Sequence, residues 1–472
     1  MSSLAQRSAL LTALALSACA AVPRQDISGP KPASAYQAEQ SFTARGASWP
    51  GDGWWRAYGD PQLDRLIEEA LAGAPDIAAA KARLAKADAA VGEARAALLP
   101  GLQGKGQIAA SKQSYNAGIP PAFVPKGYNG IGQVTLDFSW ELDFWGKNRK
   151  AVAAAASEAK ASGADVQEAR LVLSTAIAGA YADLARLWAE HDVAVRAAQS
   201  RQETLGLVSR RVADGADTRG ELEQAKAGPA NARADLAAID EQIALSRNQI
   251  AALMGEGPDS GLAIARPRAA ALKAFGLPAT LAANLVGRRP DLAAARWRAE
   301  AAASRIGVAK AQFYPDINLA AFIGYQSLGI SKLFAAGSDI GQVGPAVTLP
   351  IFEGGRLRAN LRGARADYEA AVASYDQTLT QALHEVADAA ASQRALSVRL
   401  SASAEALGAD EEAYRIARLR YEGGLANYQS VLLAEDAVLT SRRSVVDLQA
   451  RAFTLDVQLI RALGGGFHTE AN

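Results

Sequence analysis

Two stretches of this 472-residue chain, 215 positions apart, have closely similar patterns. Pro75 and Asp76 begin an alanine-rich run, and Pro290 and Asp291 begin another. An arginine, a glycine and a second proline then follow in both runs at the same spacing, without a gap. The chain is therefore predicted to be a duplicated half, with a period too long for a solenoid of short repeats. Such a duplication favours a pseudo-symmetric body that encloses an axis.

Helical periodicity dominates both halves. Residues 147–213 form a run of 67 residues without proline, about 100 Å long if it is one continuous helix. The turn glycines Gly215 and Gly424 share an offset of 209 positions. Gly228-Pro229 is predicted to kink or locally break one helix, because proline lacks the amide hydrogen that the helix needs. The expected helices are 61–73, 76–98, 147–213 and 216–254 in the first half, and 291–312, 355–421 and 425–463 in the second.

Four segments of about a dozen residues instead alternate between apolar and polar side chains, a pattern typical of strands. The strongest alternation covers residues 132–144. Asp137, Glu141 and Asp143 fall on one face, and Trp140 falls on the other. A polar interior and an apolar, aromatic-edged exterior are what a membrane barrel requires. The predicted strands lie at about 102–113, 131–145, 316–328 and 340–352.

Four strands are too few to close a barrel, and bilayer-spanning strands cannot leave open edges. Several copies of the chain are therefore expected to share one barrel, and three copies would give twelve strands or four copies sixteen. The predicted fold class is mainly α with a membrane β portion. Its long coiled α-hairpins form an α-barrel, and its four strands join the shared β-barrel.

The N-terminus has the pattern of a secretion signal. Arg7 precedes an apolar run at 9–16, and small residues stand before Cys19, the single cysteine of the chain. This pattern resembles the bacterial lipoprotein signal, which implies cleavage before Cys19 and acylation of that residue. The presence of Ala20, rather than Asp, fits sorting to the outer membrane in that class. The alternative is ordinary cleavage nearby, with Cys19 incidental.

The chain is expected to have five segments. No segment after the signal has the 18 or more apolar residues that a membrane helix needs, so a membrane crossing would have to use strands. The near balance of 50 basic and 49 acidic residues indicates no nucleic-acid partner. The segments are a signal peptide at 1–18, an N-terminal tether with an equatorial contact at 19–60, a first structural repeat at 61–270, a second at 271–463, and a C-terminal tail at 464–472.

Essentially the whole mature chain resembles the TolC-like outer membrane efflux protein family, particularly its lipoprotein branch, the NodT/OprM-like factors. Several motifs in the family's order carry this resemblance. They are Trp54-Trp55 with Asp60-Pro61 and Leu63, the run from Trp140 to Gly146, Arg289-Pro290-Asp291-Leu292 with Gly307-Val308-Ala309, the run from Pro345 to Gly355, and Tyr421-Glu422-Gly423-Gly424 with Tyr428.

The resemblance implies a homotrimer with a twelve-stranded barrel in the outer membrane of a Gram-negative bacterium and an α-helical periplasmic tunnel. It implies a passive exit duct for drugs or other small molecules. The expected partners are a periplasmic adaptor, a proton-driven inner-membrane transporter and outer membrane lipid. Because the transporter supplies the energy, no cofactor or nucleotide site is expected. The alternatives are a duct for type I protein secretion and, from a different class, an envelope lipoprotein without a pore.

The resemblance also locates candidate sites. Spacing from the tip glycine places Ser430 and Leu433 at the periplasmic aperture, and Glu221 lies nearby. Neither Ser430 nor Leu433 is acidic, so an apolar constriction at Leu433 is expected. Glu435 and Asp436 are also close enough to supply charge, or they belong to a solvated helix face.

The tips of the two helical hairpins are the expected adaptor contacts. The residues assigned to them are Gly215, Thr218, Tyr421, Gly424 and Tyr428. On the barrel, Asp137, Glu141 and Asp143 are expected to line the lumen and to favour cations, or only to hydrate the pore.

The sequence gives no support for catalysis or for a metal site. The three histidines, His191, His384 and His468, are isolated and lack metal-ligand spacing. No nucleophile elbow or phosphate-binding loop is present. The glycine triplet at 464–466 is predicted only to end a helix. The chain is therefore not expected to be an enzyme.

Overall fold

The computed structural model describes residues 29–32, 35–36, 49–268 and 287–468. The chain divides into two compact units. The first unit comprises Met1–Pro30, Leu84–Ser162 and Ala295–Tyr375, and the second comprises Lys31–Arg83, Gly163–Ala294 and Asp376–Asn472. Each unit therefore contains segments from both of the expected repeats.

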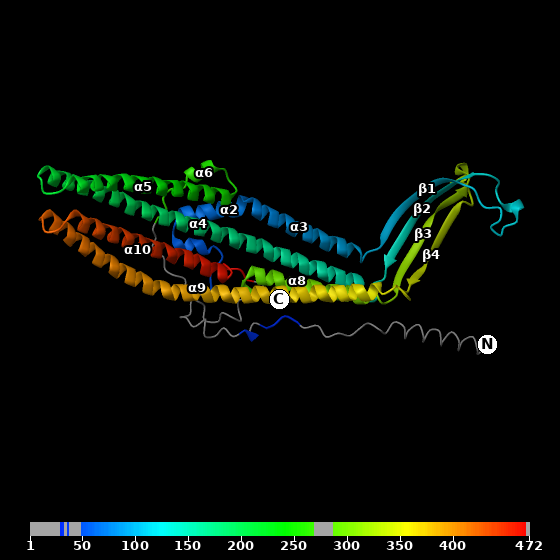
Figure 1. The fold of residues 1–472 in the computed structure, drawn as a ribbon. Coiled ribbons are helices and arrows are strands. Elements are labelled where there is room, and N and C mark those ends of the chain that lie inside the picture. Colours follow the sequence, from blue (N-terminus) through cyan, green and yellow to red (C-terminus); the bar gives the residue numbers. More distant parts are fainter. Residues whose placement is uncertain (1–28, 33–34, 37–48, 269–286, 469–472) are drawn as a thin grey trace. The chain divides into compact units, whose positions relative to one another are not determined.

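The first unit carries a four-stranded antiparallel sheet with strand order β1-β2-β3-β4 (Figure 1). Two short 3-10 helices, η3 (Pro121–Phe123) and η4 (Ile330–Lys332), lie in the loops after β1 and β3. The strands are β1 (Gly101–Ser111), β2 (Asn129–Glu141), β3 (Asp316–Leu328) and β4 (Asp339–Thr348).

The register of the sheet separates polar from apolar side chains. Leu136 pairs with Ile323 on one face, and Gln103 pairs with Asp137 on the other. The apolar face is exposed in the single chain, and Val343 of β4 retains 76% of its accessible surface. Its large exposed members are Leu102, Ile108, Val134, Leu136, Trp140, Ile323, Tyr325, Val343 and Val347.

Three strands end earlier than the sequence predicted, and the first of them is β1, which ends at Ser111 rather than at about 113. β2 ends at Glu141, so Asp143 lies in the following turn rather than on the strand. β4 ends at Thr348 instead of continuing to 352. Thr348 pairs with Asp316, the first residue of β3, so the ladder has no partner residue in β3 beyond this position.

Long helices account for most of the remaining chain. Four of them have residues in both units: α3 (Pro75–Ala96), α4 (Lys147–Ala213), α8 (Pro290–Ala311) and α9 (Arg356–Glu422). In the second unit, α5 (Arg219–Met254) pairs with α4, and α10 (Tyr428–Ala462) pairs with α9, as two helical hairpins (Figure 1). No described helix combines the length and the apolar character that a membrane-spanning helix requires.

The core of the second unit is built on the aromatic motif near the N-terminus. The 3-10 helix η2 (Trp54–Tyr58) buries its aromatic rings, and Trp54 and Trp55 meet edge to face at 5.7 Å. Asp60 then caps α2 (Pro61–Gly73) by accepting a hydrogen bond from the Gln62 amide. The Tyr181 hydroxyl donates to the same carboxylate at 2.6 Å, which attaches α4 to this turn.

The first hairpin does not break at its proline. Helix α5 runs without interruption through Pro229, and the short helix α6 (Pro258–Leu262) follows it. Of the predicted kink or local break, the break is therefore wrong, and the kink stays a prediction. Pro229 is buried in the hairpin, and it leaves the carbonyl of Ala225 without its usual helix donor.

The glycine triplet does more than end α10. A Cβ on Gly465 would lie 2.3 Å from Leu171 Cδ1, and one on Gly466 would lie 2.3 Å from the carbonyl carbon of Gly51. Both glycines also have positive φ, which favours residues without a side chain. The triplet therefore lets the C-terminal turn approach α4 and the N-terminal segment of the second unit.

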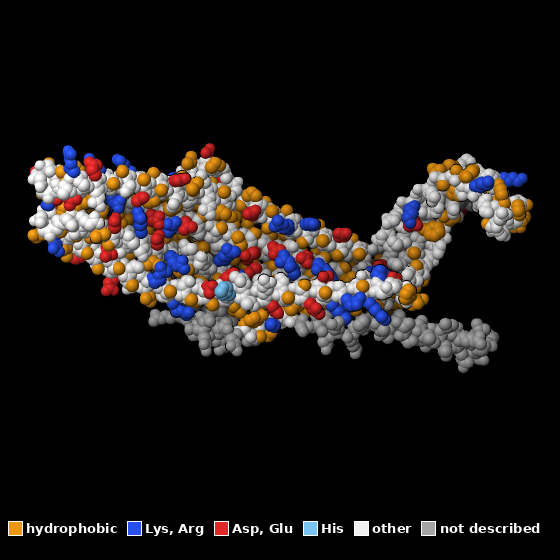
Figure 2. Space-filling view, in the orientation of Figure 1, with side chains coloured by type: hydrophobic (Ala, Val, Ile, Leu, Met, Phe, Trp, Pro, Cys, Tyr) orange, Lys and Arg blue, Asp and Glu red, His pale blue; other side chains and the backbone are white. Residues whose placement is uncertain are grey.

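Figure 2 shows basic and acidic side chains interspersed over the visible faces of the helices. This distribution agrees with the near-neutral composition. The visible surface therefore has no extensive field of one sign that would attract nucleic acid.

Candidate functional site at the helical tips and the sheet

Both hairpins turn through a glycine in the left-handed region. Gly215 has φ 75° and Gly424 has φ 73°. The residue three positions later caps the returning helix in each case: Thr218 for α5 and Asn427 for α10. The two turns are therefore built by the same local rule of a left-handed glycine followed by an N-cap.

Two of the three predicted aperture residues serve these caps. Thr218 and Glu221 form a reciprocal capping box, in which the Glu221 carboxylate accepts the Thr218 amide at 2.7 Å. The Asn427 side chain accepts hydrogen bonds from the Ser430 amide and hydroxyl at 3.1 and 2.8 Å. Leu433 is free of such ties and keeps 62% of its surface exposed.

The two tip tyrosines lie inside the second unit rather than on its surface. Tyr421 and Tyr428 are both buried in a cluster with Val208, Ala225 and Val431. The assignment of both tyrosines as adaptor contacts stays a prediction, and within this chain their rings are covered by the first hairpin. The exposed residues of the tips include Gly215, Thr218 and Gly424.

Tyr421 also joins the two hairpins through a polar link. Its hydroxyl donates a short hydrogen bond to Asp217, and Arg211 donates to the same carboxylate oxygen at 3.1 Å. The Arg211 guanidinium lies 4.6 Å from the centre of the Tyr421 ring. Burial raises the pKa of Tyr421, so the phenol remains a donor. The sequence did not predict this role for Asp217. The only sign of it in the sequence is that an acidic residue directly precedes the N-cap Thr218.

Glu435 does not belong to a solvated face. Its side chain is buried, while the adjacent Asp436 is exposed and accepts a hydrogen bond from Arg201 at 3.2 Å. The expectation that Glu435 supplies charge at an aperture is therefore corrected by its burial.

The acidic residues predicted for the lumen have close basic neighbours in the first unit. Asp137 lies 3.6 Å from the Lys105 ammonium, and Glu141 lies 2.6 Å from that of Lys147. Asp143 instead caps α4 by accepting the amides of Asn148 and Arg149 at 3.1 and 2.9 Å. Asp143 is thus committed to a helix N-terminus, which a carboxylate stabilises.

The Arg289-Pro290-Asp291 motif is explained by packing within the second unit. The buried Arg289 guanidinium binds both carboxylate oxygens of Asp291, at 3.0 and 2.7 Å, and Glu385 at 2.7 Å. It also donates to the carbonyl of Ala462 at 3.1 Å. Burial, together with the nearby Asp291 carboxylate, raises the pKa of Glu168 to about 7. The motif therefore connects α8, α9 and α10.

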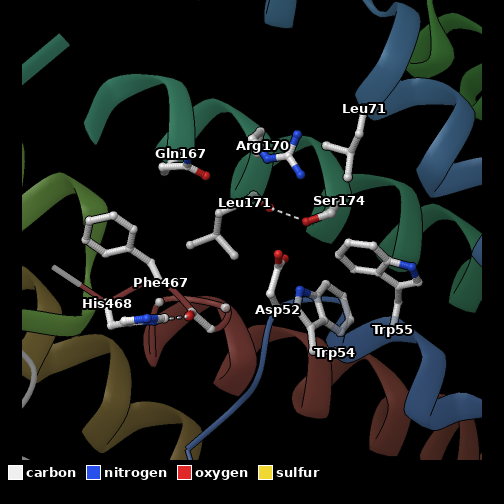
Figure 3. A pocket seen from close by; sticks show the side chains of 13 residues that line it. Asp52, Trp54, Trp55, Leu71, Gln167, Arg170, Leu171, Ser174, Phe467 and His468 are labelled. Carbon is white, nitrogen blue, oxygen red and sulfur yellow. Dashed lines mark hydrogen bonds between the residues drawn. The ribbon is translucent and has the colours of Figure 1, made fainter. Parts of the chain in front are cut away.

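A small cavity of about 240 Å³ lies where the N-terminal segment, α4 and the C-terminal turn of the second unit meet (Figure 3). Asp52, Arg170 and His468 contribute polar groups, and Trp54 and Phe467 contribute aromatic surface. The Ser174 hydroxyl donates to the carbonyl of Leu171, so it is held by its own helix.

Residues 49–268 and 287–468, with the short described segments before them, contain no group of three or more His, Cys, Asp or Glu side chains able to hold a metal. Cys19, the predicted acylation site, lies outside the described residues.

The comparison with protein families decides the classification. The model of the outer membrane efflux protein family matches residues 66–256 and 281–465, which together are well over half of the chain. The chain belongs to the outer membrane efflux protein family. Proteins of this family are channels rather than enzymes, so an enzymatic role is set aside.

Individual relatives agree with this classification. The outer membrane protein VceC of Vibrio cholerae, whose crystal structure is known, has 46% sequence identity to this chain. The two structures align with a TM-score of 0.83 over 89% of this chain and 100% of VceC. The multidrug resistance outer membrane protein MdtP of Escherichia coli K12 is 32% identical over 89% of this chain and 88% of MdtP. The fusaric acid resistance protein FusA of Burkholderia cepacia is 39% identical, over 68% of this chain and 61% of FusA.

The predicted fold class is confirmed by these comparisons. This outer membrane efflux protein is mainly helical, with long α-hairpins and four strands among its described residues, and its sheet fits a barrel shared between copies.

Proposed function

We propose that three copies of this chain form one exit duct, through which drugs or other small molecules pass passively to the cell exterior. The strongest support is the sheet of the first unit. One face of it is apolar and exposed, the other is polar, and within the described sheet β1 and β4 each pair on one side only. A membrane barrel resolves both features, because lipid covers the apolar face and neighbouring copies pair the open edges.

Three copies would contribute twelve strands, with Asp137 and Glu141 facing water in the lumen. The names of the relatives MdtP and FusA, which refer to multidrug and fusaric acid resistance, support small-molecule efflux. The duct would work with a periplasmic adaptor and a proton-driven inner-membrane transporter, and acylation of Cys19 would anchor it in the outer membrane. We also infer two structural repeats, at 61–270 and 271–463.

The proposed aperture lies at the hairpin tips. Leu433 supplies its constriction, because it is the exposed apolar residue that follows the second tip. Ser430 and Glu221 shape the helix starts beside it through their caps. Gly215, Thr218 and Gly424, together with Leu425, form the exposed surface for the adaptor.

Planar-bilayer recording with the purified full-length chain tests the duct. The expected result is stepwise ionic current from a particle that contains three subunits by native mass spectrometry. A structural lipoprotein would pass no current, and four subunits would indicate a sixteen-stranded barrel. A strain that lacks the gene separates efflux from type I secretion, since only efflux predicts retention of small toxic compounds with normal protein secretion.

A matched pair of variants tests the face assignment. Val343 and Gln342 are neighbours on β4 and point to opposite faces, because they pair with Ala321 and Phe322 of β3. Val343→Arg should hinder membrane insertion by about 2–4 kcal/mol, whereas Gln342→Arg should insert normally and alter ion selectivity. Equal insertion of both variants would contradict the assignment of the apolar face to lipid.

A further inference from the structure

Glu435 is a buried carboxyl group in the second unit that the proposed duct does not otherwise use. It lies on α10, seven residues after Tyr428, and only 4% of its surface is exposed. Its Oε1 atom is buried and has no hydrogen-bond partner in the structure. A buried charge with an unmet acceptor is costly, so the ionised form of Glu435 is poorly accommodated in this packing.

The groups around Glu435 do not fully neutralise it. Helix α4 contributes Ser200 and Arg201, and Arg201 Nε is itself buried without a partner while Nη2 donates to Asp436. The Ser200 hydroxyl hydrogen-bonds with that of Tyr414 on α9 at 2.9 Å. Two buried groups therefore lack a hydrogen-bond partner at the contact between α4 and α10. They are the donor Arg201 Nε on α4 and the acceptor Glu435 Oε1 on α10.

The other charged or titratable groups near Glu435 have partners of their own or only add to its cost. Arg418 of α9 binds Glu422 at 3.0 Å and lies 3.7 Å from Glu203. Tyr428 and Asp436 come from α10 itself, and the Asp436 carboxylate repels a second negative charge. The α5 residue Gly228 lies against Arg201 rather than against Glu435 itself, since a Cβ on it would lie 3.5 Å from Arg201 Cδ.

These surroundings set the direction of titration. Burial raises the pKa of Glu435 above its ordinary value, while Ser200 and Arg201 lower it by a smaller amount. If α10 separated from α4, water would reach the carboxyl and its pKa would return toward the ordinary value. The packed state thus binds the proton more tightly than the separated state. Acid therefore favours packing, and a rise of pH through the raised pKa favours separation.

We propose that Glu435 is a proton-responsive element of the duct, which holds α10 against α4 when protonated and loosens this contact when it ionises. The step from a looser tip to a more open duct rests on the proposed function. The change in packing itself does not depend on transport.

The Gly228-Pro229 pair explains why the packing can yield at this level. Pro229 donates no amide hydrogen, so the carbonyl of Ala225 lacks its usual helix partner. The side chain of Arg201 lies over Gly228, so this weak point of α5 is next to the unmet groups. The corresponding residues of the second hairpin, Ala437 and Val438, impose no such loss.

The test compares the full-length protein with Glu435→Gln, which keeps the shape of the side chain but cannot ionise. Asp436→Asn is the matched control, since it removes the exposed neighbouring charge. Two quantities are measured between about pH 5 and about pH 8, where a carboxyl with a raised pKa loses its proton. They are bilayer conductance and hydrogen exchange of the α4 and α10 tip peptides, the latter compared between variants at the same pH.

In the unmodified protein, conductance and the opening of the tip, taken as its exchange rate relative to the intrinsic rate at each pH, should both rise with pH, by at most about tenfold for each unit by which the pKa differs between the two states. Glu435→Gln should keep the low-pH values throughout, and Asp436→Asn should retain the pH response. An unchanged pH response in Glu435→Gln, or its loss in Asp436→Asn, would overturn the inference. Absence of any current would refute the duct, while the exchange data would still decide the role of Glu435.

Discussion

The two hairpin tips of the second unit have the same backbone plan but different chemistry. Under the 209-residue offset, Asp217 of the first tip corresponds to Ala426 of the second, and Tyr421 of the second corresponds to Val212 of the first. Each tip thus contributes one half of a hydrogen bond that neither could make with a copy of itself. The two equivalent turns thus carry different residues, a carboxylate acceptor in the first and a phenol donor in the second. Their hydrogen bond holds the two hairpins together within one chain.

A second difference concerns the exposed surface. The second tip exposes Leu425, at 73%, and Leu433, whereas the corresponding residues of the first tip are Ala216 and Gln224. The proposed apolar constriction and contact surface would therefore come from the second tip, where large apolar residues are exposed that the first tip lacks.

Loss of the carboxylate at the first tip should have the largest effect. Asp217→Ala removes the acceptor shared by Tyr421 and Arg211, and it leaves the phenol buried without a partner. We expect the local opening free energy of the tip to fall by about 2–3 kcal/mol. Hydrogen exchange of the amides at 205–225 and 418–432 measures this change.

Asp214→Ala is the matched control, because Asp214 lies in the same turn with its side chain exposed. This variant should change tip exchange by less than about 0.5 kcal/mol. If Asp217→Ala and Asp214→Ala were equally mild, the link between the tips would contribute little, and hydrophobic packing of the two tyrosines would suffice.

The caps provide a second, smaller contrast between the tips. Thr218→Ala removes one half of a reciprocal capping box, whereas Asn427→Ala removes a cap whose Ser430 partner returns no bond to the cap amide. Each substitution should cost about 1 kcal/mol, with the larger loss at Thr218 because the charged Glu221 carboxylate loses its bond from the Thr218 hydroxyl and keeps only that from the backbone amide. Exchange in the first turns of α5 and α10 distinguishes them. A larger loss at Asn427 would contradict the ranking.

Local periodicity was sufficient to predict most of the elements. The alternation of β2 and the long proline-free run of α4 each depend on side chains a few positions apart, so their character is readable along the chain. The end of β4 was wrong by a few residues because the alternation continues past Thr348, although the partner strand β3 begins at Asp316, which pairs with Thr348.

The roles of individual tip residues were harder to predict, since they depend on contacts between distant segments. Tyr421 and Tyr428 lie next to a turn, which suggested exposure, yet the other hairpin covers them. Glu435 resembles any acid on a helix face until α4 is placed against it. Asp217 acquires its role from a tyrosine 204 residues later. The residue pattern of a single helix does not show which of its faces another hairpin will cover.

Leu433→Ala should have the smallest effect on stability and the most direct effect on the proposed aperture. The side chain is largely exposed, so the substitution should cost less than about 0.5 kcal/mol. If Leu433 forms the constriction, shortening it should raise the conductance of the reconstituted channel. Gln224→Ala, at the corresponding position of the first tip, should leave conductance unchanged. An equal rise in both variants would mean that the two tips contribute alike to the aperture, and no change in either would place the constriction away from Leu433.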